Sequence, residues 1–201
     1  MRRFTTVTFD LWQTLIIDTP EIGRPRSELR MRRTIEALGA AGHHYLVEQA
    51  LDAFRRCSAQ CGDVRENEED VTFEEQVHMF LELLDPAMAK HISRDVRTIV
   101  EREYADTYLE HPPLIDPHAH TVLSRLKDGG YKLGLICNTG STPGKTQRFF
   151  LEQRGIAQFF DTLTFSDEER LSKPARRIFD VTLHRLVAMP REAVHIGDHP
   201  R

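Results

Sequence analysis

The sequence has 201 residues and a formal net charge of −4, with 40% hydrophobic and 29% charged residues. This composition is typical of a globular protein and gives no general basic field that would attract nucleic acid. The apolar runs are no longer than a strand, which argues against a membrane-spanning helix and a signal peptide. The three cysteines, a small and odd number, favour a reducing compartment over a disulfide scaffold. We therefore expect a cytoplasmic protein that binds neither nucleic acid nor membranes.

The N-terminal half begins with a short strand and continues as a series of helices. Val7 to Phe9 is apolar and is followed by Asp10. Beyond Thr14, apolar residues recur at helical spacing. The acidic run RENEED, Arg65 to Asp70, is expected to be a loop. Helices are expected at residues 27–41, 45–61, 72–84 and 93–110.

The C-terminal half alternates strands with helices after a proline-rich linker, HPPLIDP, at residues 111–117. Strands are expected at residues 131–137, 159–165 and 192–197, and helices at 119–127, 145–154 and 174–186. This alternation predicts an α/β fold with a Rossmann-like parallel sheet. The roughly ninety residues between the first strand and the linker are too many for one crossover, so they predict an all-helical cap domain. The expected division is a core of residues 1–16 and 112–201 and a cap of residues 17–111.

Polar or charged residues follow the predicted strands. Asp10 follows the first strand, and Asn138 with Thr139 follows the strand at 131–137. Lys173 lies in a loop before a helix, and Asp198 follows the last strand. Because the carboxyl ends of parallel strands meet at one edge of a sheet, we expect these side chains to lie close together.

The order of these features resembles the haloacid dehalogenase superfamily, over almost the whole chain. The first motif of that family is commonly D-x-D-G-T-L, which stands here as DLWQTL from Asp10 to Leu15. Its second motif is a strand ending in Ser or Thr, where this chain has Cys137. Its third is a lysine, here in Lys173-Pro174, and its fourth is a strand ending in Gly-Asp, here Gly197-Asp198. One such motif is weak, but all four in order predict a haloacid dehalogenase-like core with a helical cap inserted after the first motif.

The resemblance implies a hydrolase that uses an aspartate as covalent nucleophile. Asp10 would attack the phosphorus of a small phosphomonoester and form an aspartyl-phosphate, with Lys173 as the neighbouring positive charge. Mg²⁺ would be held by Asp10, Asp198 and the backbone carbonyl of Trp12, because this hard cation prefers oxygen ligands. The candidate phosphate-binding residues are Asn138, Thr139 and Thr14. An alternative role for Thr14 is a helix N-cap.

Trp12 departs from the family pattern. The acid usually found there protonates the leaving group and then activates water, and such help is worth roughly 10²–10⁴-fold in rate. An indole cannot supply it, so Trp12 predicts a slow phosphatase, a substrate with a good leaving group, or different chemistry. Family members that act on 2-haloacids carry an aromatic residue at this position, and halide leaves without a proton. A 2-haloacid dehalogenase-like hydrolase is therefore an alternative, although the Gly197-Asp198 ending favours the Mg²⁺-dependent reaction. A second alternative is a non-catalytic relative that binds a ligand or a protein.

Three further features bear on the site and its surroundings. Cys137 would be a weaker hydrogen-bond donor than a hydroxyl. The arginine cluster Arg24 to Arg33 is expected to be a solvated helix face, with an anion contact by Arg24, Arg30 or Arg33 as the alternative. The family pattern continues beyond Asp198 with another acid, a strand and a helix. Without them we expect exposed apolar surface at a sheet edge, which would favour an oligomer.

Overall fold

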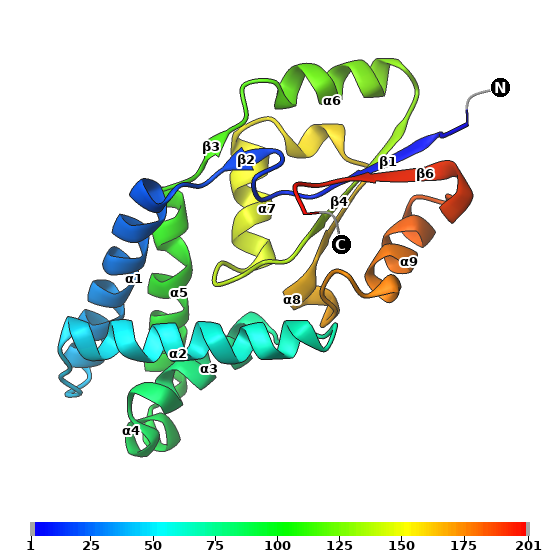
Figure 1. Ribbon diagram of the computed structural model, residues 1–201. Helices are drawn as coiled ribbons and strands as arrows, with labels where there is room; N and C mark the ends of the chain where they lie inside the picture. The colour runs from blue at the N-terminus through cyan, green and yellow to red at the C-terminus, as the bar shows by residue number, and fades with distance from the viewer. Residues whose placement is uncertain (1–2, 200–201) are drawn as a thin grey trace.

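The computed structural model describes residues 3–199, so residues 1, 2, 200 and 201 of the predicted core lie outside the described part. Its centre is a parallel sheet of four strands in the order β5-β4-β1-β6 (Figure 1). Val7 in β1 lies opposite Leu133 in β4 and Val194 in β6. The parallel sheet confirms the predicted α/β fold. The strands are β1 (Thr6–Phe9), β4 (Lys132–Cys137), β5 (Thr162–Phe165) and β6 (Ala193–Ile196).

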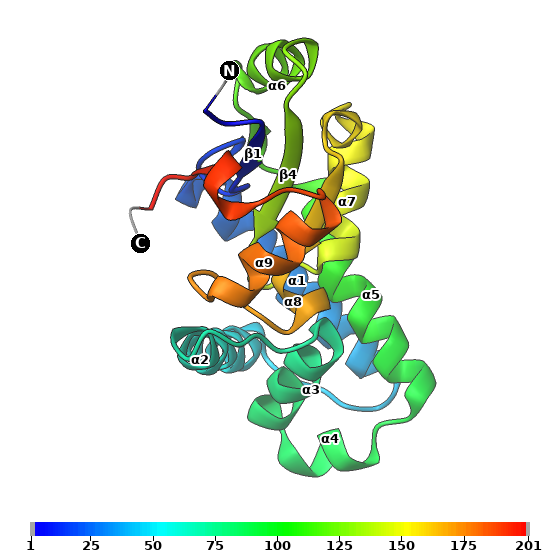
Figure 2. The same ribbon diagram turned by 90° about the vertical axis from the view of Figure 1, so that its right-hand side faces the viewer.

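Helices cover both faces of this sheet (Figure 2). On one face, Leu123 of α6 and Phe150 of α7 belong to the same buried cluster as the apolar side chains of β1 and β4. On the other face, Thr182 of α9 donates a hydrogen bond of 2.9 Å to Thr164 of β5. The helices and short turns of this half are α6 (Ala119–Asp128), α7 (Gly144–Gln153), α8 (Ser166–Glu169), α9 (Arg176–Arg185), η1 (Ala157–Phe159) and η2 (Pro190–Glu192).

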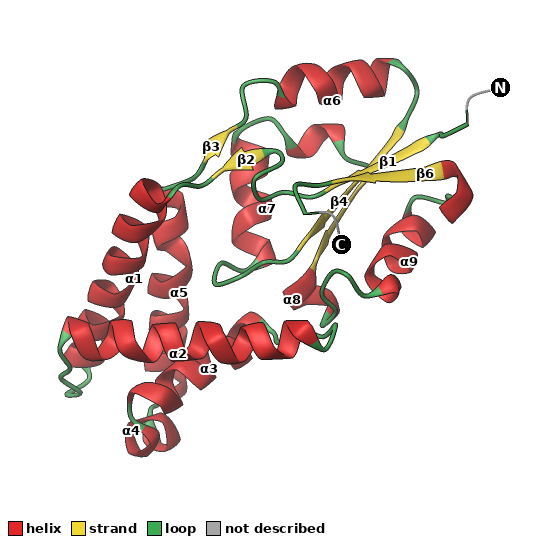
Figure 3. Ribbon diagram, in the orientation of Figure 1, coloured by secondary structure: helices red, strands yellow, loops and turns green. Residues whose placement is uncertain are grey.

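Five helices between β2 and β3 form a group that we call the helical lobe (Figure 3). The lobe has a hydrophobic core of its own, built around side chains such as Leu38, Phe80 and Tyr104. Burial of these apolar side chains is what stabilises the group. Its helices are α1 (Pro20–Ala40), α2 (Val47–Glu66), α3 (Phe73–Leu84), α4 (Pro86–His91) and α5 (Arg94–Glu110).

The two chain segments that join the lobe to the rest form a small antiparallel ribbon. It pairs β2 (Ile16–Ile17) with β3 (Leu114–Ile115). The sequence predicted only a proline-rich linker for the second segment, because two residues are too few to show a strand pattern. The ribbon places the entry and the exit of the lobe side by side.

Several predicted boundaries were wrong. Helix α1 begins at Pro20 rather than at residue 27, because a proline in the first turn fits a helix start and needs no N–H there. Helix α2 continues to Glu66, so the first two residues of the acidic run are helical. No helix begins at Thr14, which lies in a turn, so its N-cap interpretation is wrong. The short helices α4 and α8 were not predicted.

Strand β6 lies at one edge of the sheet within the described residues. Its side chains Val194 and Ile196 are 37% and 42% exposed. Apolar surface at this edge agrees with the expectation. In the part of the chain that the structure describes, no helix is both long and apolar enough to cross a bilayer.

Candidate active site

Asp10 lies directly after β1, at the carboxyl edge of the sheet. Its backbone N–H donates to the carbonyl of Ile196 at 2.8 Å, and its Oδ1 accepts the N–H of Leu11 at 2.6 Å. Gly197 allows the close approach of β6, because a Cβ at that position would lie 3.3 Å from the Cβ of Asp10. The carboxylate is thus fixed by the ends of two neighbouring strands.

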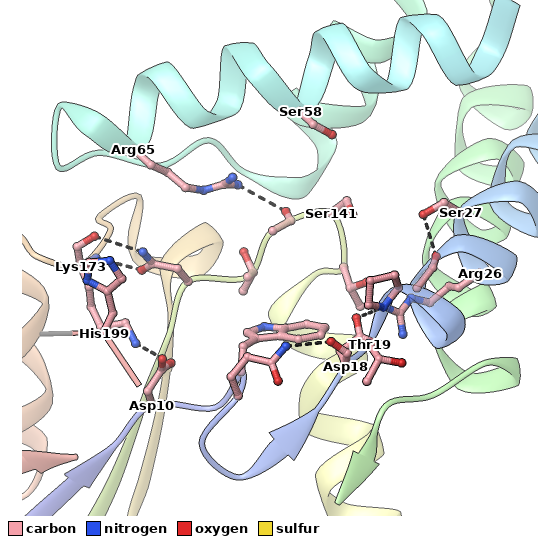
Figure 4. A pocket seen from close by; sticks show the side chains of 18 of the residues that line it. Asp10, Asp18, Thr19, Arg26, Ser27, Ser58, Arg65, Ser141, Lys173 and His199 are labelled. Atoms are coloured by element: carbon pink, nitrogen blue, oxygen red, sulfur yellow. Dashed lines mark hydrogen bonds and ion pairs between the residues drawn. The ribbon is translucent and has the colours of Figure 1, made fainter. Parts of the chain in front are cut away.

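Lys173 approaches Asp10 from the loop before α9 (Figure 4). Its Nζ lies 2.5 Å from Asp10 Oδ1 and donates to the carbonyl of Ile136 at 2.8 Å. The side chain of Asn138 holds this loop, since its Oδ1 accepts the N–H of Lys173 at 2.8 Å. Its Nδ2 donates to the carbonyl of Lys173 at 3.1 Å. Both ends of the Asn138 amide therefore position the lysine.

The electrostatic environment of Asp10 combines burial with one strong cation. Burial raises the pKa of Asp10 above its ordinary value, and the charge of Lys173 and its hydrogen bond oppose that rise. The nearby carboxylate of Asp198 adds a smaller upward effect on the pKa of Asp10. Two carboxylates at such a site repel each other unless a cation lies between or beside them.

Trp12 forms a wall of the cavity together with an aromatic ring and a guanidinium group. Its ring packs edge-to-face on Tyr108 with centroids 6.0 Å apart. The guanidinium of Arg26 lies 6.0 Å from the Trp12 ring and 5.4 Å from the Tyr108 ring. Arg26 is itself paired with Asp18. Position 12 therefore presents a packed, half-buried indole and no acid.

Cys137, at the position of the second family motif, is fully buried at the end of β4. Its thiol lies 3.3 Å from Oε1 of Gln147 in α7, and burial raises the pKa of the thiol. The side chain thus packs against α7 as a neutral group and does not line the cavity.

The other predicted phosphate-binding residues differ in position. Thr139 lines the cavity, but its backbone N–H donates to Ser166 Oγ at 2.9 Å, and its hydroxyl lies 3.3 Å from the same atom. Thr14 does not line the cavity, and its buried hydroxyl has no partner among residues 3–199. The structure brings five of the predicted residues to one cavity and places Asp198 near Asp10. Those five are Asp10, Trp12, Asn138, Thr139 and Lys173.

The cavity has a volume of about 1460 Å³ and lies between the sheet edge and the helical lobe. Ser58 and Arg65 of α2 face it across from Asp10 (Figure 4). The expectation of a solvated arginine face was wrong for Arg26 and Arg30, which are 6% and 1% exposed. Sequence spacing gave no signal for their burial, because the acceptors of Arg30 lie far along the chain.

A set of hydrogen bonds attaches the end of α2 to the core beside the cavity. Asp70 is 3% exposed and pairs with Arg65 at 3.1 Å. The hydroxyl of Ser166 donates to Asp70 at 2.5 Å, and Arg65 donates to the carbonyl of Gly140 at 3.3 Å. Ser172, next to the lysine, donates through its hydroxyl to the carbonyl of Arg65 at 3.1 Å. We call these five residues the latch.

The oxygen groups near Asp10 suit a magnesium ion. Oδ1 of Asp10 is occupied by Lys173 and Leu11, whereas Oδ2 has no hydrogen bond within residues 3–199. The carboxylate of Asp198 and the backbone carbonyl of Trp12 would complete a set of hard oxygen donors. Mg²⁺ usually keeps several waters and needs only one or two carboxylates. Among the described residues, no three His, Cys, Asp or Glu side chains form a metal cluster.

The structure is an α/β fold in which a partly buried aspartate–lysine pair lies at the carboxyl edge of a parallel sheet and faces a helical lobe across a cavity. The comparison with known families is specific: the sequence pattern of the haloacid dehalogenase-like hydrolases matches residues 4–201. The chain belongs to this family and is a hydrolase.

Several curated relatives are phosphatases by name. The chain is 30% identical over 193 residues to a glyceraldehyde 3-phosphate phosphatase of Pyrococcus abyssi, covering 96% of this chain and 72% of that protein. It is 38% identical over 82 residues to the protein of that name from Methanothermobacter thermautotrophicus, covering 41% of this chain. That match spans only 35% of the length of the relative.

Solved structures share the fold. A 2-haloacid dehalogenase from Pseudomonas syringae has a TM-score of 0.69 and 21% identity, covering 98% of this chain and 79% of that one. A phosphatase of the family from Thermococcus onnurineus has a TM-score of 0.58 and 24% identity, covering 98% and 78%. At these identities the likeness shows the architecture and not the reaction.

Proposed function

We propose that this hydrolase is a Mg²⁺-dependent phosphatase that acts on a small phosphomonoester through an aspartyl-phosphate on Asp10. The observation that carries the proposal is the contact of 2.5 Å between Asp10 and Lys173, with Asp198 close by. The names of the curated relatives support a phosphorylated substrate.

The residues present can perform the first half of such a reaction. The carboxylate of Asp10 attacks phosphorus, so that an O–P bond forms while the ester O–P bond breaks. Lys173 opposes the rise that burial causes in the pKa of Asp10 and offsets the negative charge of the phosphoryl oxygens. Asn138 holds the peptide of Lys173 so that the ammonium group stays in place. Bound Mg²⁺, held by Asp10, Asp198 and the carbonyl of Trp12, would supply further neutralisation of charge.

The second feature of the proposal is slow turnover of poor leaving groups. The departing alkoxide needs a proton, and the indole of Trp12 has none to transfer. The water that hydrolyses the aspartyl-phosphate must give up a proton, and the indole cannot accept one. The proposed substrate therefore carries a leaving group that departs readily, or the enzyme turns over slowly.

The test is phosphate release from a panel of small phosphomonoesters, with Mg²⁺ and with EDTA. We expect metal-dependent release that the Asp10→Asn variant abolishes. Asp180→Asn is the matched control, because Asp180 is a half-exposed carboxylate on α9 that pairs with Arg176. Unchanged turnover by Asp10→Asn would remove the mechanism.

The packed Trp12–Tyr108 pair favours one further candidate, hydrolysis of a 2-haloacid. There Asp10 would displace halide from carbon, and water would hydrolyse the resulting ester. This reaction needs no acid at position 12. Halide release from 2-chloropropionate that persists in EDTA, without phosphate release, would select it. If the protein releases neither phosphate nor halide, the result would favour a non-catalytic binding protein.

A further inference from the structure

Arg30 is a buried cation without a carboxylate partner among the described residues. It is 1% exposed and lies on the wall of the cavity. Its guanidinium donates to the carbonyl of Tyr104 at 2.8 Å and to the hydroxyls of Ser141 at 2.8 Å and Thr142 at 3.1 Å. Burial lowers the pKa of Arg30 to about 10, so the group stays charged at neutral pH. A buried charge is normally neutralised by a partner of opposite sign, and here all three acceptors are neutral.

The bond from Arg30 fixes the role of the Ser141 hydroxyl. A guanidinium can only donate, so Ser141 must accept with a lone pair and keeps its own proton for another acceptor. Within residues 3–199, Ser141 forms no other side-chain hydrogen bond, and it lines the cavity. Ser141 therefore presents an O–H donor to the cavity, polarised by a full positive charge behind it.

Arg24 adds a second cation that has no partner in the described part of the chain. It lies on α1 and lines the same cavity. The other lobe arginines that line the cavity already have carboxylate partners: Arg26 with Asp18, Arg55 with Asp52 and Arg65 with Asp70. Glu28, one turn after Arg24 and on the same wall, forms no ion pair with it. Among the described lobe arginines that line the cavity, Arg24 is thus the one available to a ligand, while Arg30 places an uncompensated charge behind Ser141.

We propose that Arg24 and Ser141, with the charge of Arg30 behind Ser141, form a subsite for a second anionic group on the substrate. The group is a carboxylate or a second phosphate on the part of the molecule that leaves. The inference rests on the proposed function for the phosphoryl end, bound at Asp10 and Lys173. It adds that a phosphomonoester with a neutral remainder is a poorer ligand than one with an anionic remainder.

Binding can be measured without turnover, because the chain has a single tryptophan and it lies in the cavity. Fluorescence of Trp12 would be titrated in EDTA with glycerol 3-phosphate, 3-phosphoglycerate and glycerol 1,3-bisphosphate. These probes share the phosphomonoester and differ in having a neutral, a carboxylate or a phosphate group at the other end. We expect one or both anionic probes to bind roughly tenfold more tightly than glycerol 3-phosphate, the value of one charge-assisted contact. The stronger of the two identifies the group.

The variants separate the subsite from general charge attraction. Arg24→Gln and Ser141→Ala should each remove most of the tenfold advantage, and Glu28→Gln should increase it. Arg55→Gln is the matched control, because Arg55 lines the same cavity but is paired with Asp52. It should leave the advantage intact.

Equal affinity for the three probes, or the same loss in Arg24→Gln and Arg55→Gln, would overturn the subsite. Phosphate release with Mg²⁺ is recorded separately on the same probes. Discrimination in binding without phosphate release would refute the proposed reaction and leave the subsite standing. Release of phosphate with equal affinity for the three probes would support the proposed reaction and refute the subsite.

Discussion

Asp70 is the residue whose removal should destabilise the protein most clearly. It is the last residue of the acidic run and lies 3% exposed against the core. Its carboxylate pairs with Arg65 at 3.1 Å and accepts from the hydroxyl of Ser166 at 2.5 Å and the N–H of Val71 at 2.9 Å. Asp70→Ala removes all three contacts, so the guanidinium of Arg65 and the hydroxyl of Ser166 lose their acceptor.

The expected cost follows from what the partners can do afterwards. Breaking a fully buried ion pair by removing one member costs about 3–5 kcal/mol. Here Arg65 keeps a side chain that is 20% exposed and a bond to the carbonyl of Gly140, and Ser166 can turn to Thr139 at 3.3 Å. We therefore expect a loss of about 2–3 kcal/mol in the free energy of unfolding. For a chain of this size the melting temperature would fall by roughly 4–12 °C.

Chemical denaturation followed by circular dichroism measures this loss. Asp52→Ala is the matched control, because Asp52 also pairs with an arginine of α2 but its side chain is 56% exposed. Exposed pairs of this kind contribute about 0–1 kcal/mol. If Asp70→Ala cost no more than Asp52→Ala, the burial argument for the latch would be refuted.

Two further predictions concern position 12 and a buried acid beside the latch. Trp12→Asp should raise turnover of glycerol 3-phosphate by roughly tenfold or more, because an acid there can protonate the alkoxide, and should change turnover of p-nitrophenyl phosphate much less. An equal change with both substrates would show that the new group is not acting as an acid. Burial raises the pKa of Asp167 from its ordinary value of 3.8 to about 6. Between these two pH values the native state therefore binds more protons than the unfolded state. The free energy of unfolding consequently falls as the pH rises from about 4 to 6. Asp167→Asn should flatten that fall by on the order of 2–3 kcal/mol in denaturation series across this range, and an identical pH profile in wild type and variant would contradict it.

The meeting of Asp10, Asn138 and Lys173 could be predicted from the sequence for a simple reason. Each follows a strand of one parallel sheet or lies in a loop at its carboxyl edge, so the topology alone brings them together. The local patterns also predicted most helices, because apolar spacing within one element reports the face that it buries. What the sequence could not show is that the Asn138 amide is fully engaged by the Lys173 peptide.

Contacts between elements far apart in the sequence were beyond such patterns. Arg30 lies in a run of arginines that favours a solvated face, and its burial depends on acceptors more than a hundred residues away. Asp70 belongs to an acidic run whose other members, such as Glu66 to Glu69, are less buried. In both cases one charged residue of a cluster meets a partner from another element, and composition cannot tell which one.

The latch connects the position of the helical lobe to the proposed catalytic lysine. Ser172 precedes Lys173, and its hydroxyl donates to the carbonyl of Arg65. Its backbone N–H donates to the carbonyl of Glu68 at 3.1 Å. Ser166, the first residue of α8, donates to Asp70. A displacement of the end of α2 must therefore break or move contacts at two points in the segment that precedes Lys173. The contacts between the end of α2 and the segment from α8 to Lys173 therefore link the position of the lobe to the charge beside the proposed nucleophile, Asp10.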